Sequence, residues 1–235
     1  MSRETMTRDA VVHLLESQPD PRGIAHWGEL DPAVNRLRSV GIGLSRLRKI
    51  AKGIERDHDL AMALWTTDLY EARVLGLLVD EPKKITRDQA EKQVEDLHHG
   101  MLSHVFSSCD ATLAKTGFVV ELAEDWIHHD DEDRRCCGYG LLYEISKDKR
   151  KKAPDEAFFL RHIERIRDTQ AGASQRLRMS MGGALLGVGK RSKATNAAAR
   201  VAVAEMGEIE GSPGCEPFDV MKHLTSPYIT KKLGL

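Results

Sequence analysis

Two groups of basic side chains are the residues in this sequence best suited to bind phosphate. The first group lies in one short run and comprises Arg46, Arg48, Lys49 and Lys52. The second group lies far along the chain and comprises Arg176, Arg178, Lys190, Arg191 and Lys193. Cations gathered on one surface bind nucleic-acid phosphates and make the affinity depend on salt. Taken singly, each group is more typical of a solvated helix face, and both interpretations stay open.

Two histidine pairs and a glycine-rich run carry weaker signals. The pairs are His98-His99 and His128-His129. Neighbouring residues on a helix point about 100° apart, so such a pair does not readily share one metal. The run Gly187-Val-Gly-Lys190 lacks the GxxxxGK[ST] spacing of a phosphate loop, and its glycines indicate the end of a helix instead. We therefore expect no metal site and no organic cofactor.

The cysteines predict no zinc site and no disulfide framework. The four are Cys109, Cys136, Cys137 and Cys215. No CxxC spacing occurs among them, and adjacent cysteines rarely pair because the geometry is strained. We expect reduced, mostly buried thiols.

The bulk composition is that of a soluble globular protein. Of 235 residues, 41% are hydrophobic and 30% charged. No apolar run reaches the roughly 18 residues of a membrane span, and the polar N-terminus lacks the apolar core of a signal peptide. We expect a cytoplasmic monomer that does not bind membranes. The net charge is −1, so any DNA binding must depend on how charge is distributed.

Helical spacing of apolar residues recurs along the chain, and strand signals are nearly absent. The predicted helices span 7–16, 44–54, 60–65, 72–79, 87–98, 102–115, 118–128, 134–145, 155–167, 174–188 and 194–208. Short connections favour antiparallel helix pairs, and a long succession of such pairs predicts an all-α fold, an α-solenoid. A compact irregular helical domain is the alternative.

We expect one domain over residues 1–235. It comprises N-terminal helices in 1–40, repeats in 41–210 and a C-terminal cap in 211–235. The segment 147–154 is the most linker-like part of the chain. Gly182-Gly183 falls inside a predicted helix, where it could allow close approach of another helix or of a DNA backbone.

Three runs follow one another in the first half: Gly43–Lys52 (GLSRLRKIAK), Asp59–Trp65 (DLAMALW) and Tyr70–Leu78 (YEARVLGLL). In this order they resemble the DNA alkylation repair family, whose AlkD-like members are HEAT-repeat DNA glycosylases. Phe106–Asp110, Trp126–Arg135 and Arg178–Arg191 continue the match. The resemblance covers roughly residues 40 to 230, and it implies HEAT-like helix pairs with a basic concave surface for duplex DNA.

The resemblance also implies a chemistry, the excision of cationic N3- and N7-alkylpurines. Asp110 would stabilise the sugar cation, and Phe106 would pack on the deoxyribose where tryptophan is usual. A second tryptophan position falls on or near Gly183, which has no ring to attract a cation. Arg135 matches a phosphate-contacting arginine.

The cations expected to hold DNA phosphates extend beyond Arg135. They are Arg134, Arg46, Lys49, Arg176, Arg178, Lys190 and Arg191. For Arg134 and Arg135 a local ion-pair network with the acids of 130–133 is the alternative. Trp65 and Trp126 are expected in the core, whereas Trp27 could replace a missing aromatic.

Two other functions stay open on this scaffold. The first is a non-catalytic binder of DNA structure, which Phe106 and Gly183 favour. The second is a helical-repeat module for protein interaction, which would show no salt-dependent DNA binding.

Overall fold

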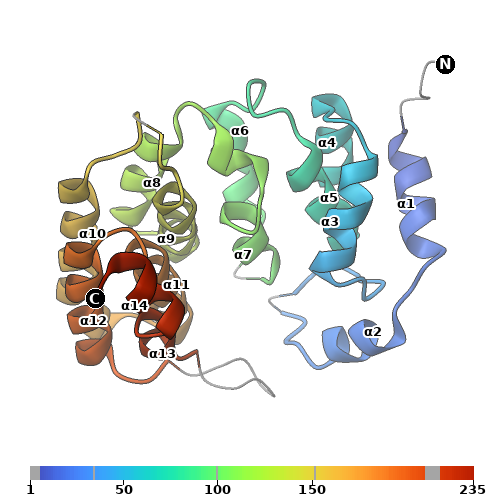
Figure 1. Ribbon diagram of the computed structural model, residues 1–235. Helices are drawn as coiled ribbons and strands as arrows, with labels where there is room; N and C mark the ends of the chain where they lie inside the picture. Colours follow the sequence, from blue (N-terminus) through green and yellow to red (C-terminus); the bar gives the residue numbers. More distant parts are fainter. Residues whose placement is uncertain (1–5, 34, 99, 151, 210–217) are drawn as a thin grey trace. The chain divides into compact units, whose positions relative to one another are not determined.

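The computed structural model describes residues 6–33, 35–98, 100–150, 152–209 and 218–235. Within these ranges the regular structure is helical, and the one β-type pairing is an isolated parallel bridge between Arg38 and Leu69. The fold is therefore all-α, as expected (Figure 1). Chain contacts group it into two compact units, Met1–Phe118 (unit 1) and Val119–Leu235 (unit 2). The expectation of one domain over residues 1–235 stays a prediction.

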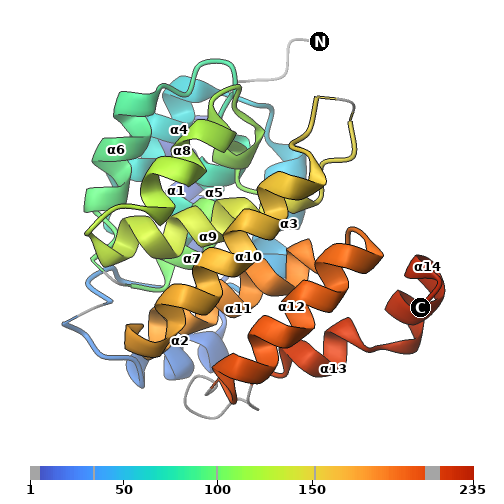
Figure 2. The ribbon, with the colours of Figure 1, turned by 90° about the vertical axis from the view of Figure 1, so that its left-hand side faces the viewer.

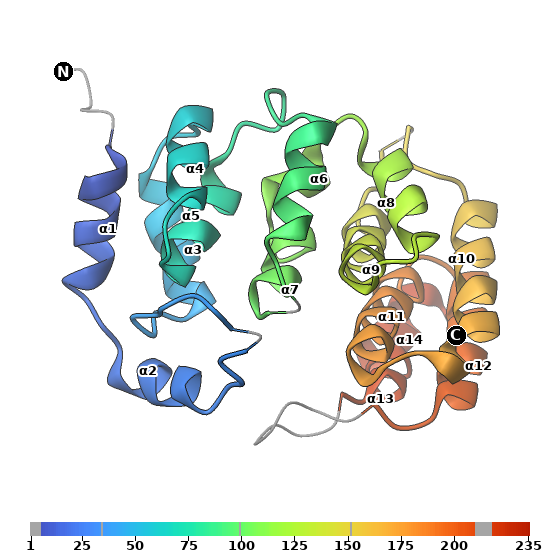
Figure 3. The same ribbon diagram turned by 180° about the vertical axis from the view of Figure 1, so that it is seen from behind.

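Unit 1 is a set of short helices. They are α1 (Arg8–Glu16), α2 (Pro21–Gly28), α3 (Leu44–Gly53), α4 (His58–Trp65), α5 (Tyr70–Val79), α6 (Arg87–Glu95), α7 (Leu102–Ser107) and the 3₁₀ helix η1 (Thr112–Lys115). The mostly apolar α5 packs against α1, α3, α4, α7 and η1, which explains why it is apolar on most sides (Figure 3). Leu47, Leu64 and Leu75 are fully buried in this core.

A buried carboxylate fastens the segment before α3 to α5. Glu71 is 1% exposed. It accepts hydrogen bonds from the Ser39 hydroxyl at 2.6 Å and from the backbone amides of Val40 and Ile42 at 3.2 and 3.1 Å. A buried carboxylate is costly unless it is hydrogen-bonded, and these three donors meet that requirement.

Unit 2 has longer helices. They are α8 (Val119–Ile127), α9 (Glu132–Ser146), α10 (Glu156–Thr169), the 3₁₀ helix η2 (Gln170–Gly172), α11 (Gln175–Val188), α12 (Lys193–Met206), α13 (Val220–Leu224) and α14 (Pro227–Leu233). Helix α9 packs between α8 and α11, and α10 packs on α12 (Figure 2). Trp126, Tyr139 and Phe159 are the largest buried side chains here.

Side-chain caps set many of the helix starts. Asp131 caps α9, and Glu132 and Asp133 follow in its first turn, so the acids of this stretch satisfy and complement the helix N-terminus. Asp155 accepts from the amide of Phe158 at 2.9 Å, which confirms its expected capping role. The glycine run ends α11 at Val188 with Gly189 as the cap, again as expected.

One predicted helix is wrong. The expected helix over 102–115 ends at Ser107, and η1 follows only after a turn. Cys109 and Asp110 have φ angles of 58° and 73°, so the chain leaves the right-handed helical region between two apolar stretches. The Ser108 hydroxyl donates to the His104 carbonyl at 2.5 Å and satisfies one of the carbonyls left at the helix end.

Three helices have no counterpart among the predicted ones. They are α2, α13 and α14. Each spans eight residues or fewer, which is too short for a recurring apolar stripe to mark it. Asp20 and Ser226 cap α2 and α14, each followed by proline at the first helical position. The predicted C-terminal cap falls partly on residues 211–217, which lie outside the described residues.

Candidate functional site

Asp110 lies on an exposed turn of unit 1. Its carboxylate is 62% exposed, and Arg48 Nε of α3 lies 3.0 Å from its Oδ2. Arg48 thus belongs to the surroundings of the predicted catalytic residue, which its place in the basic run did not reveal. The carboxylate is exposed to solvent, lies beside the Arg48 guanidinium and belongs to a turn and not to a helix. It is therefore accessible to a ligand.

Cys109 precedes Asp110 and meets a histidine. Its Sγ lies 3.2 Å from His104 Nε2. Burial raises the pKa of this thiol, but the hydrogen bond and charge of His104, with smaller contributions from Ser108 and Arg48, lower the pKa overall. Cys136, by contrast, is buried, and burial raises its pKa to about 11. Cys109 is half-buried and Cys136 and Cys137 are buried, whereas Cys215 lies outside the described residues.

Phe106 lies beneath this turn and not on the surface. It is 0% exposed, and its ring centroid lies 6.0 Å from that of Trp65. The side chain therefore supports the turn from the core. Trp65 and Trp126 are 6% and 1% exposed, which confirms their expected place in the core.

The two glycines of α11 differ in their surroundings. A Cβ on Gly182 would lie 2.5 Å from Ile209 Cδ1 and 3.3 Å from Val220 Cγ2, so this glycine allows the C-terminal segment to approach. A Cβ on Gly183 would meet nothing within 4 Å. The position expected to carry an aromatic ring therefore borders open space.

Two of the predicted phosphate-binding residues, Arg134 and Arg176, form ion pairs with acids at the start of α9. Arg176 contacts Glu132 at 3.0 Å and Asp133 at 2.5 Å, and Arg134 lies 3.7 Å from Asp131. The Arg134 pair matches the alternative interpretation of a local ion-pair network, whereas the alternative for Arg176 was a solvated helix face. Arg135 differs, because its buried Nε has no hydrogen-bond partner among the described residues.

The remaining predicted cations lie at separate places. Arg46 donates to the Gln18 side chain, and Lys49 is exposed on the same helix. Arg178 donates to the carbonyls of Met206 and Glu208 and so caps the end of α12. Asp110, Phe106, Arg46 and Lys49 belong to unit 1, whereas the other predicted site residues belong to unit 2.

Lys190 and Arg191 line a basic pocket in unit 2. We use this name for the cavity of about 630 Å³ whose charged residues are Lys147, Lys149, Glu156, Lys190, Arg191 and Lys232. Lys190 and Arg191 are among the cations predicted to bind phosphate, whereas Lys147 and Lys149 fall in the segment predicted to be linker-like. No sequence signal placed Lys232, which reaches the pocket from α14.

Metal chemistry finds no support in the described residues, where no group of three potential ligands occurs. His128 Nδ1 lies 2.7 Å from the Glu124 carbonyl, and His129 Nδ1 accepts from the Asp131 amide at 2.9 Å. His99 lies outside the described residues.

Trp27 belongs to α2 and is half-buried, with its ring against Tyr70 of α5. Its indole Nε1 donates to the Leu37 carbonyl at 3.0 Å, and its ring centroid lies 4.7 Å from that of Tyr70. Both rings line a pocket of about 180 Å³ in unit 1. The indole is thus fixed by local contacts.

Comparisons place this architecture among helical-repeat repair proteins. A family model described as "DNA alkylation repair enzyme" matches residues 22–205, so the chain belongs to that family. A solved structure is similar over 98% of this chain and 97% of that chain, with a TM-score of 0.80 and 20% sequence identity. It represents "a new family of proteins related to the HEAT-like repeat DNA glycosylases with affinity for branched DNA structures". No curated protein matches the chain.

These findings confirm the family resemblance and the HEAT-like all-α fold class. In the described part of the chain, no helix is both long and apolar enough to span a bilayer. The roles of the individual site residues stay predictions.

Proposed function

We propose that this protein binds DNA through the phosphate backbone and recognises the structure of the DNA without excising a base. Membership of the DNA alkylation repair family supports DNA as the partner. The similar solved structure comes from proteins with affinity for branched DNA, which supports a structured duplex as the preferred form.

One observation carries the non-catalytic reading. At both positions where the family resemblance implies an aromatic ring, this chain offers no ring face, since Phe106 is fully buried and Gly183 has no side chain. Aromatic faces attract cations, and excision moves the positive charge of the alkylated base onto the sugar as the glycosidic bond breaks and the base leaves neutral. Without them the protein retains a carboxylate and phosphate-binding cations but loses a principal source of stabilisation for the reaction.

Binding assays on matched DNA forms test this function. Fluorescence anisotropy with a four-way junction, a bubble and a linear duplex of shared sequence should give the tightest binding on the junction. The binding constant should fall as salt is raised, because phosphate contacts release counterions. Salt-independent or absent binding to all three forms would instead favour a module for protein interaction.

A second candidate function is excision of N3- or N7-alkylpurines from duplex DNA. It is favoured by Asp110, whose exposed carboxylate stands on a turn that fixes it before any ligand arrives. A carboxylate placed beside a developing cation lowers the energy of the transition state.

Base release from methylated DNA separates the two candidates. Under the second candidate, the wild type releases methylated purines above the level of Asp110→Asn. Asp68→Asn is the matched control, since Asp68 is also an exposed aspartate, 73% exposed, paired with an arginine, Arg38, at 2.9 Å. Equal release by the wild type and Asp110→Asn would refute excision and leave the binding function standing.

A further inference from the structure

The basic pocket of unit 2 has a charge balance that calls for an anion. Five cationic side chains and one carboxylate, Glu156, line its cavity of about 630 Å³. Glu156 accepts a hydrogen bond from the Ser192 hydroxyl at the start of α12, so it is engaged at the pocket wall. A cleft lined by one sign of charge focuses the field and attracts ligands of the opposite sign.

Two of the pocket cations, Arg191 and Lys232, are positioned by neutral partners, which leaves their charge available. Arg191 Nη1 donates to the carbonyls of Ser146 and Asp148 at 2.6 and 2.8 Å, and its guanidinium lies 4.2 Å from the Phe159 ring centroid. Lys232 Nζ donates to the Lys190 carbonyl at 2.9 Å. These contacts fix the side chains without cancelling their charge.

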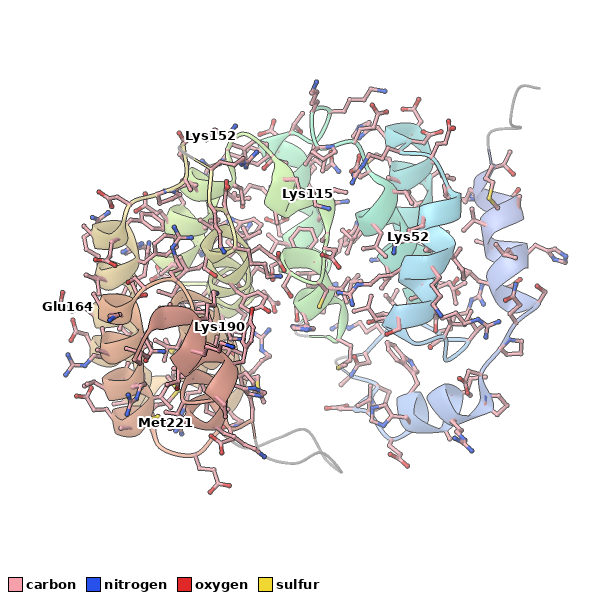
Figure 4. The ribbon with its side chains drawn as sticks, viewed as in Figure 1. Lys52, Lys115, Lys152, Glu164, Lys190 and Met221 are labelled. Atoms are coloured by element: carbon pink, nitrogen blue, oxygen red, sulfur yellow. The ribbon has the colours of Figure 1, made fainter. Side chains whose placement is uncertain are left out.

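Lys190, which is labelled in Figure 4, shares the pocket with four other cations. Burial lowers the pKa of its ammonium, and the charges of Lys232 and Lys147 lower it further. Among the pocket cations in the described structure, Lys147 has an ion pair with a carboxylate, Glu144, at 2.8 Å, whereas the other four have none. An anion in the pocket would relieve this repulsion.

We propose that the basic pocket binds a phosphate group of a nucleic-acid strand. Several cations spread around a cavity suit an anion with several acceptor oxygens, which phosphate provides. The inference rests on the proposed function, since it assigns a particular contact to DNA binding. A monoester at a strand end and a diester within a strand share this chemistry, and the experiment distinguishes them.

The first measurement uses small phosphate probes and the full chain. Calorimetric titration with a 5′-phosphorylated thymidine dinucleotide, the same dinucleotide without the 5′-phosphate, and inorganic phosphate separates the sources. A monoester site binds the phosphorylated dinucleotide and inorganic phosphate, whereas a diester site binds both dinucleotides alike. In Lys190→Gln/Lys232→Gln the affinity should fall about tenfold or more, as expected for losing hydrogen bonds to a charged group.

The second measurement follows junction DNA by anisotropy over a salt series. Lys190→Gln/Lys232→Gln should lower the slope of log K against log salt by about one to two, one for each lost phosphate contact. Lys222→Gln/Lys231→Gln is the matched control, because both lysines are exposed and neither lines the pocket, and Lys231 is on the same helix as Lys232.

The outcomes separate this inference from the proposed function. Phosphate binding that depends on Lys190 and Lys232, without any binding of DNA, would support the pocket and refute the function. DNA binding that is equally affected in the pocket variant and its control, together with dinucleotide binding unchanged in the pocket variant, would overturn the pocket. Unchanged circular dichroism and thermal unfolding establish that both variants fold.

Discussion

At the scale of single residues, the backbone at Cys109 and Asp110 decides where the predicted catalytic carboxylate lies. Both residues have φ angles in the left-handed region, 58° and 73°. Aspartate tolerates this region better than most side chains, and glycine tolerates it best. The turn thus limits which residues can occupy position 110, whatever the chemistry requires.

Substitutions at Asp110 should separate backbone strain from ion pairing. Asp110→Gly should leave the free energy of unfolding unchanged or raise it by up to about 1 kcal/mol, because the left-handed backbone no longer carries a side chain. Loss of the exposed pair with Arg48 offsets less than about 1 kcal/mol. Asp110→Val should lower it by about 1 to 3 kcal/mol, since a branched Cβ is strained there. Urea unfolding of both variants measures the difference, and equal stability would contradict the argument.

His162 should make the free energy of unfolding depend on pH. Burial lowers its pKa to about 4, with smaller contributions from the charges of His128, Arg161 and Arg165. The unfolded chain, with a histidine pKa near ~6.5, therefore binds a proton that the folded protein does not. Stability should fall as the pH drops from about 6.5 to 4, by at most about 3 kcal/mol.

The nearby Glu124 carboxylate, 3.8 Å from His162 Nε2, favours the protonated ring and reduces this effect. Urea unfolding at pH 7 and pH 4.5 tests the dependence. In His162→Leu the difference between the two pH values should shrink, whereas His13→Leu, at an exposed position in α1, should behave as the wild type does. An unchanged difference in His162→Leu would show that other groups control the acid sensitivity.

At the scale of helices, α8 and α9 pack against each other at a glycine, Gly138. A Cβ on Gly138 would lie 2.7 Å from the backbone nitrogen of Ile127 and 3.1 Å from the Ala123 carbonyl. Neither backbone atom can move without shifting α8. The glycine is therefore what lets these two helices approach.

Alanine at two helical glycines should act in opposite directions. Gly138→Ala should lower the free energy of unfolding by about 1 to 3 kcal/mol through overpacking. Gly183→Ala, in open space, should raise it by about 1 kcal/mol because alanine is the better helix former. Thermal and urea unfolding of the two variants measure this contrast, and destabilisation by both would place an unseen contact at Gly183.

Helices were predictable where an amphipathic stripe or a cap marked them. The helical spacing of Leu47, Leu64 and Leu75 predicted that they are buried, and all three are. The apolar spacing predicted one helix over 102–115, which is wrong. Phe106 and Leu113 are both buried, but a turn defined by its backbone angles lies between them. Only Lys190 and Arg191 of the basic pocket were predicted as phosphate-binding residues. Lys232 could not be grouped with them, because it belongs to α14, about forty residues further along the chain.

At the scale of the whole molecule, the strength of DNA binding should depend on the cations that are not paired with acids, and not on the total number of basic residues. The formal net charge is −1. Several of the cations predicted to hold DNA are already engaged, since Arg176 and Arg134 pair with acids and Arg178 caps a helix. Local charges that remain available, such as those of the basic pocket, must outweigh the overall negative charge.

The salt dependence of DNA binding measures this available charge. Each neutralised phosphate contributes roughly 0.9 to the slope of log K against log salt. We expect a slope of about 3 to 5 for linear duplex, below the value that all eight predicted cations would give. Anisotropy titrations between low and moderate salt provide the slope. A value of seven or more would mean that Arg176 and Arg134 exchange their carboxylate partners for phosphate.

The left-handed turn at Asp110 also bears on how activity is assigned across relatives. Because its backbone favours aspartate, asparagine or glycine, selection for folding alone can preserve an acid at this position. A relative that no longer excises bases would then still carry an aspartate at the position of Asp110. Position 183 borders open space, so folding places no such constraint on it, and a ring there would be lost first. Classification of relatives by activity should therefore weigh position 183 above the aspartate.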